Sequence, residues 1–136
     1  QMLCQSPMIL LDGAHNPDGA QVLKTSLETY FPGRKFRFMM GVMADKHYEE
    51  MLQIITPLAE SFTCVAVEDD RALDSDSLAA LIRQNYGIPA RDAGSVAQGL
   101  ELELADQTKD QILVIFGSLY QAGDVLHYFK EHGLMA

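Results

Sequence analysis

The segment "LLDGAHNPDGA", residues 10–20, contains the signals of a strand followed at once by a helix. The apolar run "MILL" (8–11) that leads into it is typical of a buried strand. Asn16 and Pro17 mark a helix start, because Asn accepts a backbone N–H at the N-cap and Pro fits the first helical position. Asp18 then complements the positive end of the helix dipole. The segment therefore predicts one β-α unit.

The same pattern recurs along the chain. Further apolar runs predict strands at 36–42, 62–67 and 112–116, a weaker strand at 90–92, and an edge strand "MLCQ" (2–5) that pairs back on "MILL" through a Ser6-Pro7 turn. Apolar residues at helical spacing predict helices after Pro17 and over 51–58, 78–86 and 122–129, with Gly133 as the last C-cap. "SVAQ" (95–98) is typical of a capping box that opens a helix through Leu104.

Strands and helices thus alternate about five times, which predicts an α/β domain with a mostly parallel sheet of about six strands and right-handed crossovers. The apolar runs are continuous rather than alternating, as in strands covered on both faces. No linker, repeat or low-complexity tract interrupts the pattern. We therefore expect residues 1–136 to form a single domain.

Composition limits the partners. The chain has 10 basic and 19 acidic residues, a net charge of −9 and no basic patch, so nucleic acid and anionic membranes are not expected partners. A negatively charged ligand such as ATP would need help from helix N-termini or another domain. We expect no signal peptide, and the sequence has no apolar run long enough to span a membrane. Cys4 and Cys64 are interpreted as buried free thiols, which indicates a cytoplasmic location.

Polar residues follow three of the predicted strands, where ligands bind in parallel sheets. In the first cluster, Asp12 and His15 exceed what the turn and the helix cap require. The carboxylate of Asp12 can accept hydrogen bonds from a ribose diol or an ammonium group, and His15 can donate to a phosphate or ribose oxygen. The alternative is that Asp12 stabilises its own turn and His15 is a solvated loop residue.

The second cluster is "GVMADKHYEEM", residues 41–51. Asp45 is expected to cap the following helix, which places Lys46 and His47 in its first turn. Basic residues oppose the helix dipole there, so either they face a bound anion or they are solvated.

The third cluster is "FGSLYQAGD", residues 116–124. Ser118 is a natural N-cap for the last helix, and backbone N–H groups at such a helix start can bind an anion. Capping alone also explains Ser118. The acidic stretch "EDDRALDSD" (68–76) is typical of a solvated loop rather than a metal site. The sequence contains no G-x-x-x-x-G-K-[ST] loop, so this chain lacks the phosphate-binding loop of P-loop enzymes.

Four motifs together resemble a known family. "LDGAHNPDGA", "GVMADKHYEEML", "DRAL" and "GSLYQAG" occur in the order and spacing of the C-terminal domain of folylpolyglutamate synthases, which are ATP-dependent amide ligases of the Mur ligase superfamily. The resemblance covers essentially the whole chain. It implies a Rossmann-like, three-layer α/β/α fold with one antiparallel edge strand.

The resemblance also implies a reaction. ATP phosphorylates the terminal γ-carboxylate of a folate, and the amine of L-glutamate then attacks the acyl phosphate. An N-terminal ATPase domain is implied as the partner; it carries the P-loop, the Mg²⁺ ligands and most of the folate pocket. The C-terminal domain alone is therefore expected to be inactive, with no certain catalytic residue and no metal ligand of its own.

The site residues implied by the resemblance fall into two groups. The first, at the ATP, consists of Asp12 near the ribose, His15 and Arg71. The second, near the glutamate or the nucleotide, consists of Asn16, Asp45, Lys46, Ser118 and Tyr120.

The sequence also departs from the family pattern. His47 stands where "DKD" is usual, Gln121 replaces an apolar residue, Asp124 replaces Glu, and Arg71 lacks the preceding proline. Gly13 favours the polyglutamylating enzymes over relatives that also make dihydrofolate. Two other interpretations stay open: another Mur-type ligase with a different acceptor, and a stand-alone α/β nucleotide-binding or interaction module without catalysis.

Overall fold

The computed structural model describes residues 1–5, 8–45, 47–106, 108 and 110–134. The strands are β1 (Met2–Gln5), β2 (Met8–Leu11), β3 (Phe36–Met40), β4 (Ala59–Val65), β5 (Ala90–Gly94) and β6 (Ile112–Phe116). The helices are α1 (Pro17–Tyr30), α2 (Tyr48–Ile55), α3 (Ser75–Tyr86), α4 (Val96–Asp106) and α5 (Leu119–Glu131), with a short 3₁₀ helix η1 (Thr56–Leu58) after α2.

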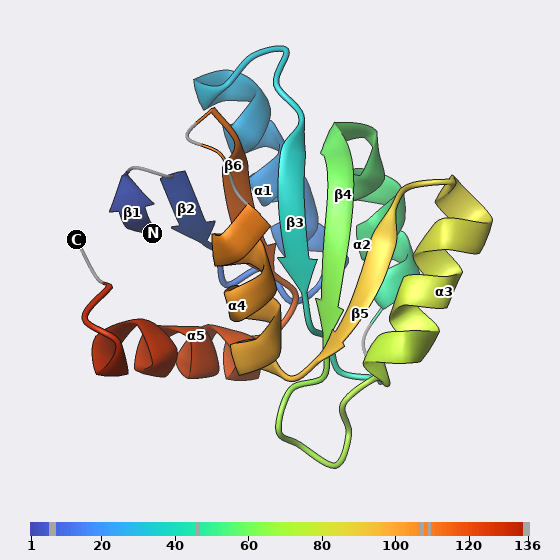
Figure 1. Cartoon of the computed structure of the whole chain (residues 1–136). Helices are drawn as coiled ribbons and strands as arrows, with labels where there is room; N and C mark the ends of the chain where they lie inside the picture. Colours follow the sequence, from blue (N-terminus) through green and yellow to red (C-terminus); the bar gives the residue numbers. More distant parts are fainter. Residues whose placement is uncertain (6–7, 46, 107, 109, 135–136) are drawn as a thin grey trace.

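The strands form one sheet in the order β1-β2-β6-β3-β4-β5 (Figure 1). Every neighbouring pair is parallel except β1 and β2 at the edge, which are antiparallel. The mostly parallel sheet with one antiparallel edge strand is therefore confirmed. The predicted Ser6-Pro7 turn lies outside the described residues. Within the described part of the chain, no helix is long and apolar enough to span a membrane.

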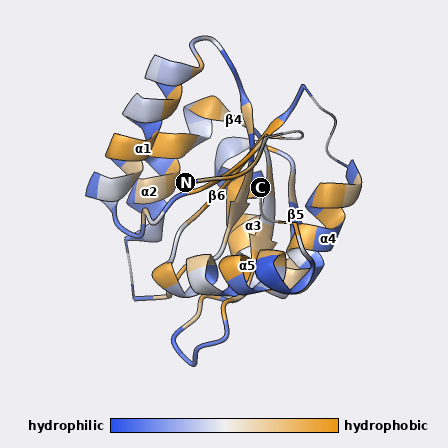
Figure 2. Ribbon diagram, turned by 90° about the vertical axis from the view of Figure 1, so that its left-hand side faces the viewer, coloured by the Kyte–Doolittle hydropathy of each residue, from blue (hydrophilic) through white to orange (hydrophobic). Residues whose placement is uncertain are grey.

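Apolar layers cover both faces of the sheet. Helices α1, α2 and α3 pack on one face with residues such as Leu23, Leu52 and Ile82. Helices α4 and α5 pack on the other face with Leu100 and Phe129. The strands β3 and β6 between them are buried along their whole length, and β6 has the orange of hydrophobic residues in Figure 2. The three-layer α/β/α prediction is confirmed.

Aromatic side chains fill the layer beneath α1, α2 and α3. The Phe38 ring stacks on Phe62 at 5.4 Å between centroids and meets Phe116 edge-on at 5.5 Å. Such pairs add about 0.5–1.5 kcal/mol each beyond the area that they bury. These rings belong to the adjacent strands β4, β3 and β6, so their contacts stabilise the centre of the sheet.

Local capping signals were reliable at three helix starts. Asn16 Oδ1 accepts the Gly19 N–H at 2.8 Å, and Ser118 Oγ accepts the Tyr120 N–H at 3.0 Å. The predicted capping box is present, with the Gln98 N–H donating to Ser95 Oγ at 3.1 Å. Each of these caps fixes the residue at which its helix begins, and so fixes the end of the turn that precedes the helix.

The prediction that Asp45 caps the second helix is wrong. Helix α2 begins at Tyr48, and His47 occupies the N-cap without a side-chain cap bond. Before it, Met43 forms an isolated antiparallel bridge with Ala72, and residues 44–45 form a turn in which the Ala44 N–H donates to the Arg71 carbonyl at 2.7 Å. Asp45 is therefore part of this turn and not the cap of α2. Lys46, the other predicted residue of this turn, lies outside the described residues.

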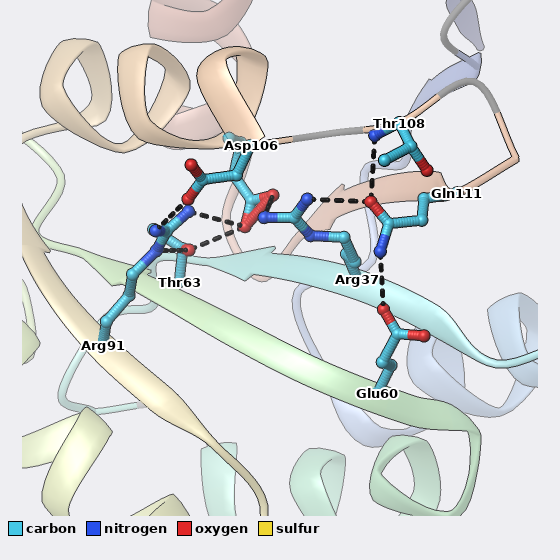
Figure 3. Close-up of polar contacts among 8 residues, drawn as sticks. Arg37, Glu60, Thr63, Arg91, Asp106, Thr108 and Gln111 are labelled. Atoms are coloured by element: carbon cyan, nitrogen blue, oxygen red, sulfur yellow. Dashed lines mark hydrogen bonds and ion pairs between the residues drawn. The ribbon is translucent and has the colours of Figure 1, made fainter.

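A buried ionic network fixes α4 on the sheet (Figure 3). The Glu103 side chain on α4 is 1% exposed and pairs with Arg37 Nη2 at 2.9 Å and Arg91 Nη2 at 3.5 Å. The Thr63 hydroxyl donates to Glu103 Oε1 at 2.7 Å, and Arg91 also pairs with Asp106 at 2.5 Å. A buried carboxylate is tolerated only with such partners, so the network specifies where α4 docks.

Replacing Glu103 with Ala is predicted to destabilise the fold by about 3–5 kcal/mol, because Arg37 would stay buried without its counter-charge. Urea denaturation measures the change. Glu101→Ala is the matched control, since Glu101 is an exposed carboxylate of the same helix, and it should alter stability by no more than about 0.5 kcal/mol. Equal effects of the two substitutions would show that the network does not hold α4.

Candidate functional site

Four segments meet at the carboxyl end of the sheet: 12–16 after β2, 41–45 after β3, 66–74 after β4 and 117–120 after β6 (Figure 1, lower edge). Backbone hydrogen bonds connect them. The Gly117 N–H donates to Ala14 O at 2.8 Å, and the Leu73 N–H donates to Val42 O at 2.9 Å. The polar clusters of the sequence are therefore parts of one surface.

Gly117 makes the closest approach between these segments. Its φ is 125°, and a Cβ at this position would lie 2.5 Å from the Gly41 carbonyl oxygen. No other residue fits both the backbone conformation and the space. Behind it, the buried Gln121 amide donates to the Phe116 carbonyl at 2.6 Å, so this departure from the family pattern anchors the end of β6.

The segments enclose a cavity of about 220 Å³. The described residues that line it are His15, Met43, Asp45, Arg71, Gly117, Ser118, Leu119 and Tyr120. Five of the residues predicted for the site, His15, Asp45, Arg71, Ser118 and Tyr120, thus come together from four segments that are far apart in the sequence.

Arg71 supplies the cavity with a positive charge. Its Nη2 donates to the Tyr120 hydroxyl at 3.0 Å, and its Cζ lies 5.8 Å from the Tyr120 ring centroid. On its other side, Arg71 Nε donates to Asp69 Oδ1 at 3.1 Å. This hydrogen bond lowers the pKa of Asp69 and raises that of Arg71, so both groups are charged. Sequence reasoning did not single out Asp69.

The His15 ring has a defined orientation. Nδ1 lies 3.0 Å from the Gly13 carbonyl oxygen. A carbonyl only accepts hydrogen bonds, so Nδ1 carries the proton, and Nε2 accepts when the ring is neutral and donates when it is protonated. His15 can therefore serve either a hydroxyl or a phosphate oxygen.

Two predicted residues do not line this cavity. Asn16 caps α1 through Gly19, and the cap explains it fully. Asp12 Oδ1 accepts the Ala14 N–H at 2.8 Å, as the turn-stabilising alternative expects. Asp12 also borders a separate, more apolar cavity of about 390 Å³ between β2 and α1. Its Oδ2 has no hydrogen-bond partner among the described residues.

The arrangement suits an anion better than a metal. Arg71 and the N-terminus of α5, where Leu119 and Tyr120 line the cavity, both attract negative charge. In the described ranges, no three His, Cys, Asp or Glu side chains are grouped so that they could hold a metal ion. The described residues at this edge therefore offer an anion one guanidinium and one helix N-terminus.

Residues 1–119 match the family described as "Mur ligase, glutamate ligase domain". The chain therefore belongs to this family of Mur ligase domains. The mostly parallel sheet and the cavity at its carboxyl end agree with this assignment to a class of α/β domains.

Particular relatives are folate enzymes. The folylpolyglutamate synthase of Lacticaseibacillus casei is 34% identical over 126 residues, which cover 92% of this chain and 28% of that protein. A probable bifunctional folylpolyglutamate synthase/dihydropteroate synthase of Haloferax volcanii is 30% identical over 120 residues, or 88% of this chain and 14% of the relative. The solved Mycobacterium tuberculosis folylpolyglutamate synthase, complexed with ADP and AMPPCP, is 26% identical with a TM-score of 0.83.

The solved structure is matched over 95% of this chain and 31% of its own length. The chain thus spans less than a third of each of these three proteins.

Gly117→Ala is predicted to destabilise the domain by at least about 2 kcal/mol, because the new Cβ conflicts with the positive φ and with the Gly41 carbonyl. Gly123→Ala is the matched control, since a Cβ there meets nothing within 4 Å. Because Gly123 lies inside α5, the control should stabilise by about 0.5–1 kcal/mol. Urea denaturation of both variants decides; a neutral Gly117→Ala would mean that the segments do not depend on this contact.

Proposed function

We propose that this chain is the C-terminal domain of a folylpolyglutamate synthase, an ATP-dependent ligase that adds L-glutamate to the γ-carboxylate of a folate. The observation that carries the proposal is the cavity to which all four motif segments contribute His15, Asp45, Arg71, Ser118 and Tyr120. Family membership and the folate enzymes among the relatives support it.

In this proposal, the chain contributes a binding surface for ATP rather than a complete site. Arg71 contacts a phosphate, and His15 contacts a phosphate or ribose oxygen. The Oδ2 of Asp12 accepts from the ribose hydroxyls at the neighbouring turn. With a net charge of −9 and one arginine at the cavity, the chain alone should bind ATP weakly.

A companion ATPase domain would hold the triphosphate and Mg²⁺, since the described residues of this chain offer no metal-ligand cluster. Phosphoryl transfer to the folate carboxylate gives an acyl phosphate, whose carbon the glutamate amine attacks with loss of phosphate. The exposed carboxylate of Asp45 can accept from the glutamate ammonium group before the attack. Ser118 acts mainly as the cap that fixes the start of α5 beside the cavity.

The first test uses the full-length protein that carries this domain. His15→Ala and Arg71→Ala are each predicted to reduce kcat/KM for ATP about tenfold to a hundredfold, equivalent to about 1–3 kcal/mol, without lowering the melting temperature. The assay is ADP release that depends on both folate and glutamate. Lys130→Ala, which removes an exposed positive charge at the far end of α5, is the control and should have no effect.

Near-normal activity of both variants would overturn the proposed site. Turnover that requires a different acceptor in place of folate would keep the ligase class and overturn the substrate. The 136-residue chain by itself should bind ATP only at about millimolar Kd and form no product. Micromolar binding or product formation by the chain alone would mean that it contains the whole active site.

A further inference from the structure

Arg71 lies on the loop between β4 and α3, at the bottom of Figure 1. Its side chain is 58% exposed. An exposed arginine ordinarily samples many rotamers, and it loses that freedom when a ligand binds. How strongly Arg71 holds an anion therefore depends on whether the protein orders it beforehand.

Asp69 orders Arg71 from within the same loop. Its Oδ1 accepts both the Arg71 backbone N–H at 2.9 Å and Nε at 3.1 Å, while Oδ2 accepts Nη2 at 3.4 Å. The two carboxylate oxygens thus face two guanidinium nitrogens, a paired geometry that fixes the plane of the group. Asp69 is itself held, because the Ala72 N–H donates to its carbonyl at 3.0 Å and its own N–H donates to Val67 O at 2.9 Å.

Tyr120 holds the guanidinium from the α5 side, through the hydroxyl that accepts from Nη2 at 3.0 Å. Nη1 is then the one guanidinium nitrogen of Arg71 without a hydrogen-bond partner in the part of the chain that the structure describes. Asp69 is absent from the described lining of the cavity, whereas Arg71 and Tyr120 belong to it. The contacts leave the N–H groups of Nη1 available to a ligand.

We infer that Asp69 is a positioning residue for nucleotide binding and acts through Arg71. It holds Nε and Nη2, so that Nη1 meets a phosphate oxygen without loss of side-chain freedom. The inference rests on the proposed function, in which Arg71 binds the nucleotide.

The negative charge of Asp69 also has an opposing effect, because it repels a phosphate. Asp70 separates the two effects. It is the adjacent, exposed carboxylate, and it makes no hydrogen bond or ion pair with another described residue. Asp70→Asn therefore removes the same charge from the same loop but leaves Arg71 held. If Asp69→Asn weakens nucleotide binding and Asp70→Asn does not, the ordering of Arg71 by Asp69 outweighs the repulsion between Asp69 and the phosphate.

The experiment is a titration of the 136-residue chain with ADP and Mg²⁺, followed by NMR to saturation. Asp69→Asn is predicted to raise Kd about threefold to tenfold relative to Asp70→Asn. Arg71→Ala should raise Kd at least as much. Adding Asp69→Asn to Arg71→Ala should not raise Kd further, because the ordering effect of Asp69 acts only through Arg71 and only its repulsion of the phosphate is left to remove. The melting temperatures of the variants should agree.

A second measurement follows the Arg71 Nε–H signal, which should exchange slowly with water in the original chain and quickly in Asp69→Asn. Equal Kd values for Asp69→Asn and Asp70→Asn, with Arg71→Ala weakened, overturn the inference alone. Additive effects of Asp69→Asn and Arg71→Ala also overturn it, since Asp69 would then act by another route. No effect of Arg71→Ala, or no binding of ADP by the original chain, contradicts the proposed function and the inference with it.

Discussion

The contact between the backbones of Gly117 and Gly41 is the constraint on which the site depends. Gly117 turns with φ 125° directly above the end of β6, and any Cβ there would strike the Gly41 carbonyl. This close approach brings the segments after β3 and β6 into contact. The hydrogen bond from the Gly117 N–H to the Ala14 carbonyl brings the segment after β2 into contact with them. The cavity exists because three strand ends are held within contact of one another.

The charge of this chain bears on how much of the ATP binding it can provide in the proposed ligase. The chain has a net charge of −9. Among the described residues that line the cavity, one is an arginine, Arg71. Coulomb attraction of one exposed guanidinium for a phosphate is modest in water. In the function that we propose, this chain contributes orientation, and the companion ATPase domain supplies most of the affinity for the triphosphate.

Sequence signals predicted the local parts of the fold well. The caps at Asn16, Ser118 and Ser95 act over two or three residues, so the neighbouring sequence contains everything that specifies them. The buried strands β3 and β6 were likewise evident from continuous apolar runs in the sequence. The prediction that Asp45 caps α2 was wrong because Asp45 lies in a turn, and the Ala44 N–H of that turn donates to the carbonyl of Arg71, which lies far along the chain.

The contacts that sequence reasoning missed are also distant ones. Sequence reasoning did not single out Glu103, because its partner Thr63 lies 40 residues away and no periodicity reveals such a pair. Asp12 and His15 were grouped because they are close in sequence, but the fold directs them to different cavities. Tyr120 and Arg71, 49 residues apart, were each predicted for the site, and the structure adds the hydrogen bond that joins them.

The central claim is that the post-strand segments form one nucleotide-binding surface. A crystal structure of the chain with ADP and Mg²⁺ tests it most directly, because it measures where the nucleotide lies. The account predicts a phosphate oxygen within hydrogen-bond distance of Arg71, in the cavity between His15 and Tyr120. Phosphates in the apolar cavity between β2 and α1, away from Arg71, or a nucleotide at the amino ends of the strands beside Arg91, would contradict it.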